Sequence, residues 1–168
     1  MNHSTPEPGL VLKEQRLLYT MANAHFTHEV VCPILARHYD DLKLELSALF
    51  DTTVEQLGEL QHSCMDALVR LKSEAMVELV VEAVPVGLDT LPKEHEPRMY
   101  VKQVLRDMVL LHARVSGAAR GFTGRALYAV ANRVAEAMVE GLKGVAVTTA
   151  AARRQVRPGW WDCVSRAS

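Results

Sequence analysis

The strongest constraint on the fold is one long run of apolar residues at helical spacing. Its apolar positions step by three or four residues throughout, and they are Val54, Leu57, Leu60, Cys64, Leu68, Leu71, Ala75 and Leu79. This spacing places them on one face of an α-helix, and no proline follows before Pro85. The pattern predicts a helix over residues 52–83, about 48 Å long at 1.5 Å per residue. Since a compact globule of this chain length is only roughly 40 Å across, we expect an elongated fold.

The start of this long helix has its own sequence signal. Residues 52–55 read Thr-Thr-Val-Glu, which has the spacing of a capping box. In that motif Thr52 caps the first amides of the helix and Glu55 reaches back to it. We therefore expect the helix to begin at Thr52.

Two predicted helices precede it. The first should run from Leu10 to about Asn23, with Leu17, Leu18 and Met21 on its apolar face and residues 13–15 on the opposite face. A second should start at Thr27 as N-cap and bend at Pro33, which lacks one hydrogen-bond donor. Alternatively, the two form one kinked rod.

Two more helices are expected after a region rich in prolines. The main linker, residues 84–97, contains Pro85, Gly87, Pro92 and Pro97. A fourth helix should begin at Glu96 or Pro97, and a fifth at Thr123 as N-cap, so that the two form a hairpin. We assign the turn between them to Gly117, Gly121 and Gly124, because glycine readily adopts positive φ.

Composition agrees with helices and excludes several functions. Apolar residues make up 49% of the chain but aromatic residues only 5%, which suits helices better than sheets. The net charge of −1 excludes a strongly basic nucleic-acid-binding domain. Three widely spaced cysteines imply no disulfide framework. With neither a signal peptide nor a transmembrane run in the sequence, we expect a cytoplasmic protein.

These patterns predict an all-α fold, an elongated antiparallel helical bundle or rod of about five helices, in three parts. Residues 1–9 are expected to be a disordered leader, 10–143 the bundle, and 144–168 a poorly ordered basic tail. Four arginines against one aspartate give the tail a charge of +3, and it also contains Trp160 and Trp161. That mixture allows weak peripheral contact with an anionic membrane, although a solvated tail is the favoured interpretation.

Two groups of residues and one single histidine are the candidates for a chemical function. His25, His28 and Cys32 lie at i, i+3 and i+7 but lack a fourth zinc ligand, so we expect no metal. The glycines named above, with Arg120 and Arg125, match no phosphate-binding motif. His112 is expected on the apolar face of the fourth helix, buried and hydrogen-bonded to a backbone carbonyl. No catalytic residue and no cofactor are therefore predicted.

The order of several segments resembles a known family. These segments are Arg16-Leu17-Leu18-Tyr19-Thr20-Met21-Ala22-Asn23, Cys32-Pro33-Ile34-Leu35, the insert Glu82–Gly87, Tyr100-Val101-Lys102-Gln103-Val104-Leu105, Leu111-His112-Ala113-Arg114-Val115 and Arg125-Ala126-Leu127. Together they are similar to the C-terminal helical region of exocyst complex component 2, over about residues 14–143. The family's Phe-Ser-x-x-Gly-x-x-Gln-Ala segment has no counterpart after Gly144, and its large N-terminal portion is missing. The resemblance thus implies a fragment or short isoform.

The resemblance also implies a function. It points to a non-enzymatic subunit of the complex that tethers secretory vesicles to the plasma membrane before fusion, located peripherally at both membranes. Its partners would be other exocyst subunits, without nucleic acid or a small-molecule substrate. We expect an acidic partner surface to contact Lys102, Arg106, Arg114 and Arg133. The alternative is a small helical-bundle enzyme or ligand-binding protein that uses a buried histidine.

Overall fold

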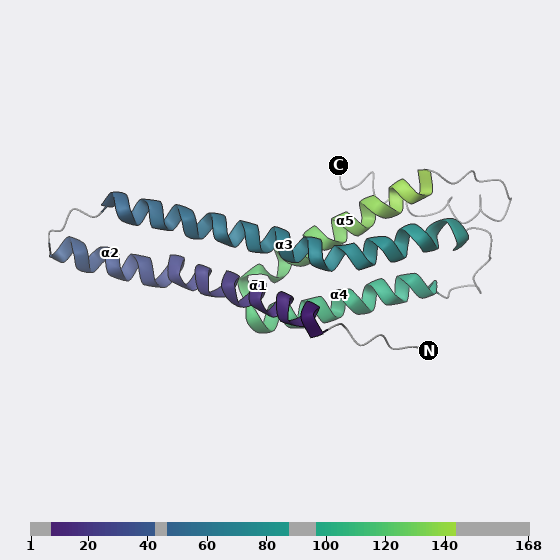
Figure 1. Cartoon of the computed structure of the whole chain (residues 1–168), viewed down its shortest axis with the longest axis horizontal. Helices are drawn as coiled ribbons and strands as arrows, with labels where there is room; N and C mark the ends of the chain where they lie inside the picture. The colour runs from purple at the N-terminus through teal and green to yellow at the C-terminus, as the bar shows by residue number, and fades with distance from the viewer. Residues whose placement is uncertain (1–7, 43–46, 88–96, 144–168) are drawn as a thin grey trace. The chain divides into compact units, whose positions relative to one another are not determined.

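The computed structural model describes residues 8–42, 47–87 and 97–143, and these residues form helices without any strand (Figure 1). The α-helices are α1 (Pro8–Phe26), α2 (Cys32–Asp41), α3 (Ser47–Gly87), α4 (Met99–Ala118) and α5 (Thr123–Lys143). The predicted all-α fold with about five helices is confirmed. The leader up to residue 7, most of the predicted 84–97 linker and the basic tail 144–168 lie outside the described residues.

The segment from α1 to α2 is continuous, so the kinked-rod alternative is correct. A turn of π-helix, Thr27–Val31, joins the two α-helices, and the Cys32 amide donates to the Thr27 carbonyl. The residues on either side of this turn, Phe26 and Cys32, both have helical backbone angles, so Thr27 is no N-cap. Pro33 falls in the first turn of α2. The π-helical turn thus accommodates Pro33, whereas an uninterrupted α-helix would lose one backbone hydrogen bond at this proline.

Helix α3 is longer than predicted at both ends. Its 41 residues span roughly 60 Å at 1.5 Å per residue. The predicted capping box is wrong, because the helix already begins at Ser47 and the Thr52 hydroxyl donates to the Ala48 carbonyl at 2.9 Å. At the other end the helix continues past Pro85 to Gly87.

The turn between α4 and α5 is not built as predicted. None of Gly117, Gly121 and Gly124 has a positive φ. The chain instead leaves the helical conformation at Ala119, with φ −148° and ψ 59°, and a short 3-10 turn, Arg120–Phe122, leads into α5. The Thr123 hydroxyl donates to the Arg120 carbonyl at 2.9 Å, whereas an N-cap would accept a bond from an amide further along the helix.

The chain divides into two compact units. The first contains, of the described residues, 8–42 and 47–72 with 111–129. Its buried residues include Leu18, Met21, Cys64, Leu68, Leu111, Val115, Phe122 and Ala126. Within this unit α1–α2 is antiparallel to the first part of α3. Glu14 pairs with Lys72 at one end, and the rings of Tyr39 and Phe50 lie 5.4 Å apart at the other.

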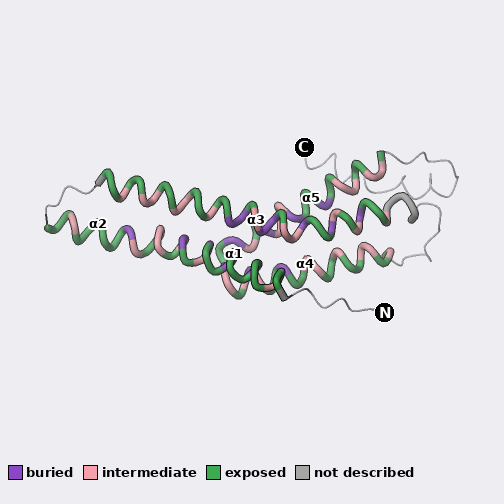
Figure 2. The backbone as a smooth tube through the Cα atoms, viewed as in Figure 1, coloured by how far each residue is buried: buried purple, intermediate pink, exposed green. Residues whose placement is uncertain are grey.

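The second unit contains, of the described residues, 73–87 and 97–110 with 130–143. Its buried residues in the described part include Met76 and Val80 from α3 and Val130 and Val134 from α5, each pair spaced by four residues. Figure 2 shows buried positions recurring along α3 and α5 between exposed ones. Both elements therefore contribute a narrow apolar stripe, as expected for packed helices.

Candidate functional site

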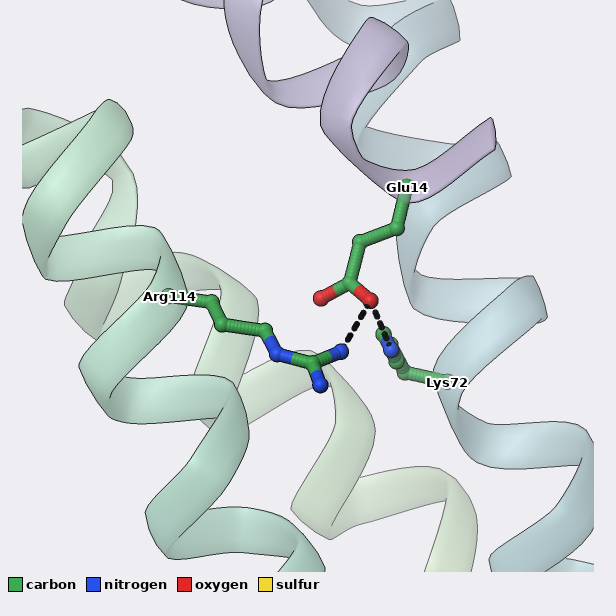
Figure 3. A network of polar contacts seen from close by, with 3 residues as sticks. All are labelled: Glu14, Lys72 and Arg114. Carbon is green, nitrogen blue, oxygen red and sulfur yellow. Dashed lines mark hydrogen bonds and ion pairs between the residues drawn. The ribbon is translucent and has the colours of Figure 1, made fainter. Parts of the chain in front are cut away.

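The most unusual site in the first unit is a buried ion cluster of Glu14, Lys72 and Arg114. These side chains come from α1, α3 and α4 and converge on one point (Figure 3). Glu14 is only 2% exposed and is the single acidic residue of α1. It lies four residues before Leu18 and seven before Met21, both buried, which places its carboxylate on the apolar face of the helix.

Both cations bind the same carboxylate oxygen. Lys72 Nζ donates to Oε2 of Glu14, and Arg114 Nη1 donates to that oxygen at 2.5 Å. The other oxygen, Oε1, is buried and has no hydrogen-bond partner among the described residues. The side chains of Lys72 and Arg114 are 20% and 38% exposed, so the cations reach towards water although the carboxylate does not. The cluster therefore links α1 to α3 and α4 within the first unit.

Sequence reasoning placed Glu14 on the polar face of the first helix, and that prediction was wrong. The spacing of Glu14 to Leu18 and Met21, four and seven residues, could have identified it as part of the apolar face. A carboxylate on a buried apolar face needs a cationic partner. The two cations could not be deduced in this way. They lie 58 and 100 residues away along the chain.

The four predicted interaction residues do not share one environment. Lys102 and Arg106 are exposed on α4, and Arg133 is exposed on α5 and donates to Ser73 Oγ at 3.4 Å, all within the second unit. Arg114 belongs to the first unit, where it binds Glu14. Its guanidinium has a carboxylate partner inside the chain.

The histidine and cysteine residues near the bend do not converge. The His25 ring packs edge-on against Phe122, with centroids 5.1 Å apart. Nδ1 of His28 lies 2.8 Å from Oε1 of Glu29, and Cys32 is buried. In the part of the chain that the structure describes, no three His, Cys, Asp or Glu residues are placed to hold a metal ion.

The prediction of a buried His112 is wrong. This side chain is exposed, whereas its neighbour Leu111 is buried together with Val115. The buried stripe of α4 in this unit continues through Ala119 to Phe122. The buried stripe therefore includes Leu111 and not His112. His112, which the ligand-binding alternative requires to be buried, faces solvent.

Two cysteines, Cys32 and Cys64, are free thiols in the interior. Burial raises the pKa of the Cys64 thiol, because the apolar surroundings disfavour the thiolate. Such a thiol is a weak nucleophile at neutral pH. Cys64 therefore serves as a small apolar core residue of α3.

None of the described helices combines the length and apolarity needed to cross a bilayer. Comparison with protein families matches residues 2–153 to the family described as exocyst complex component Sec5. The matched stretch runs past both ends of the 10–143 region in which the segments named above lie. No curated protein and no solved structure matches the chain.

Proposed function

Because the chain belongs to the exocyst complex component Sec5 family, we propose that it is a non-catalytic exocyst subunit that helps to tether secretory vesicles to the plasma membrane. The single observation that carries this proposal is the family match over most of the 168 residues. The other exocyst subunits are its proposed partners, and its proposed location is peripheral, at the plasma membrane and secretory vesicles.

We further propose that the chain corresponds to the C-terminal helical region of exocyst complex component 2, as a fragment or short isoform. This finer assignment is supported by the sequence segments between residues 14 and 143. The all-helical fold of the described residues is compatible with it.

The binding surface that we propose for an acidic partner lies on α4 and α5. Lys102 and Arg106 are four residues apart, so their side chains lie on the same face of α4, and both are exposed. Arg133 of α5 is also exposed and lies in the same unit. Arg114 differs from the other three candidates, because its guanidinium is bound to the buried Glu14 and it belongs to the first unit. Exposed charges of this kind act mainly on the rate of association.

Titration of the full chain against the remaining exocyst subunits at two ionic strengths tests the proposal. Binding to at least one subunit is expected, and Lys102→Glu with Arg106→Glu should slow association and flatten its salt dependence. The matched control is Arg120→Glu with Arg125→Glu, two exposed cations near the start of α5. Absence of binding at micromolar concentration to every subunit would refute the proposed function.

The structure does not support the alternative, a ligand-binding bundle built around a buried histidine. His112 is exposed, and none of the histidines within the described ranges is buried. An increase in melting temperature with a small metabolite, without binding to any exocyst subunit, would restore that alternative.

A further inference from the structure

Large apolar side chains form an exposed stripe along α1. Leu12, Tyr19 and Phe26 are 49%, 59% and 58% exposed. They are seven residues apart, which is close to two full turns, so they lie almost directly above one another on the helix. An exposed apolar row along one face of a helix can pack against the apolar face of a second, amphipathic helix.

The π-helical turn keeps this stripe continuous into α2. In an uninterrupted α-helix the next position of the row after Phe26 would be Pro33. The wide turn at Thr27–Val31 uses one additional residue, which shifts the row to Ile34, eight residues after Phe26. Ile34 is 49% exposed. The row Leu12, Tyr19, Phe26 and Ile34, here called the outer stripe, therefore runs along one face across the junction.

Among the described residues, the exposed charges beside the N-terminal part of the outer stripe are the two cations Lys13 and Arg16. Lys13 and Arg16 are exposed, and neither forms an ion pair with another described residue. Arg16 lies four residues after Leu12 and three before Tyr19, between them on the same face. The one acidic residue of α1, Glu14, is buried and bound to Lys72 and Arg114, so it does not offset these cations at the surface.

We propose that the outer stripe docks an amphipathic helix of another exocyst subunit, one whose apolar row is flanked by carboxylates opposite Lys13 and Arg16. This inference rests on the proposed function and adds a second surface to it, on α1–α2. Aromatic side chains such as Tyr19 and Phe26 supply much of the affinity at protein interfaces, and the flanking charges select the partner. Two cations are too few to hold the segment on an anionic membrane, which favours a protein partner.

The test compares two double variants of the full chain for binding to the remaining exocyst subunits. Tyr19→Ser with Phe26→Ser should weaken binding at least tenfold. Tyr128→Ser with Leu49→Ser removes an aromatic and an aliphatic residue of similar exposure from α5 and α3, and should leave binding unchanged. Both variants should fold, because all four positions are exposed. Far-UV circular dichroism and the melting temperature check this.

A second pair of substitutions tests the chemistry of the partner and does not depend on removing apolar contacts. Lys13→Glu with Arg16→Glu should slow association about tenfold at low salt, and the effect should shrink as salt rises. If wild type binds and both sets of variants bind equally well, the outer stripe is not the docking surface, although the proposed function stands. If wild type binds no subunit, both proposals fail. Self-association of the isolated chain in sedimentation equilibrium, abolished by Tyr19→Ser with Phe26→Ser, would identify a second copy as the occupant and overturn the inference.

Discussion

Replacing Glu14 by glutamine should destabilise the first unit, because it removes the negative charge that two cations share. The amide has nearly the shape of the carboxylate, so the change leaves packing almost intact. In the wild type, Lys72 and Arg114 both donate to Oε2 of a side chain that is 2% exposed. In Glu14→Gln the two cations repel each other across a neutral group, and the glutamine Nε2 finds no acceptor in either of them.

The size of the effect follows from how far each charge is buried. Removing one partner of a fully buried ion pair costs about 3–5 kcal/mol, mainly because the other charge stays desolvated. Here the side chains of Lys72 and Arg114 are 20% and 38% exposed and can recover part of their hydration. We therefore expect a loss of about 2–3 kcal/mol in the free energy of unfolding. For a chain of this length that corresponds to a fall in Tm of roughly 4–12 °C.

Urea unfolding followed by far-UV circular dichroism measures this loss, and a double-mutant cycle with Arg114→Met tests its cause. If the cluster is the cause, the double variant should be less destabilised than the sum of the single variants by about 1 kcal/mol or more. Glu136→Gln, a change at an exposed acid of α5, is the control and should stay within about 0.5 kcal/mol of wild type. The reasoning is refuted if Glu14→Gln also stays within that range or if the cycle is additive.

Three further substitutions check the helices of the first unit. Gly58→Ala should raise the free energy of unfolding by about 0.5–1 kcal/mol, because Gly58 lies inside α3 with nothing within 4 Å of an added Cβ. A lower free energy of unfolding in urea would show that the added methyl group meets a contact. Thr52→Ala should change stability by less than about 0.5 kcal/mol, whereas loss of a true N-cap would remove about 1 kcal/mol. Burial raises the Cys64 pKa, so its contribution to stability is full below the usual thiol pKa of 9.0 and is lost as pH rises through the higher folded-state pKa. Between about pH 8 and 10 the free energy of unfolding should therefore fall less steeply with pH for Cys64→Ala than for wild type. Equal slopes for the two proteins would contradict this prediction.

Periodicity located the helices well but their ends poorly. The apolar residues at helical spacing over 54–79 correctly predicted the central part of α3. A stripe of this length and spacing is typical of a helix and of few other structures. Its predicted cap failed, since the hydroxyl of Thr52 can also donate back to the carbonyl four residues earlier, as it does here. Local sequence does not decide between these two hydrogen bonds.

The candidate sites depended on details of register that one-dimensional patterns do not contain. His112 was assigned to the buried stripe, but the helix places Leu111 and Val115 inside and His112 outside, a rotation of one residue. The π-helical turn was not predicted, because Pro33 in the sequence indicates only a bend and not the type of helical turn that precedes it. The partners of Glu14 were hidden for a different reason, since contacts over such sequence separations follow only from the packed fold.

The central claim, membership of a vesicle-tethering assembly, is tested most directly by purifying the tagged 168-residue chain from its source cells. Mass spectrometry of the co-purifying proteins is the readout, with the Tyr19→Ser, Phe26→Ser variant purified in parallel. Exocyst subunits should co-purify with the wild-type chain and should be depleted with the variant. Recovery of the folded wild-type chain without any exocyst subunit would contradict it.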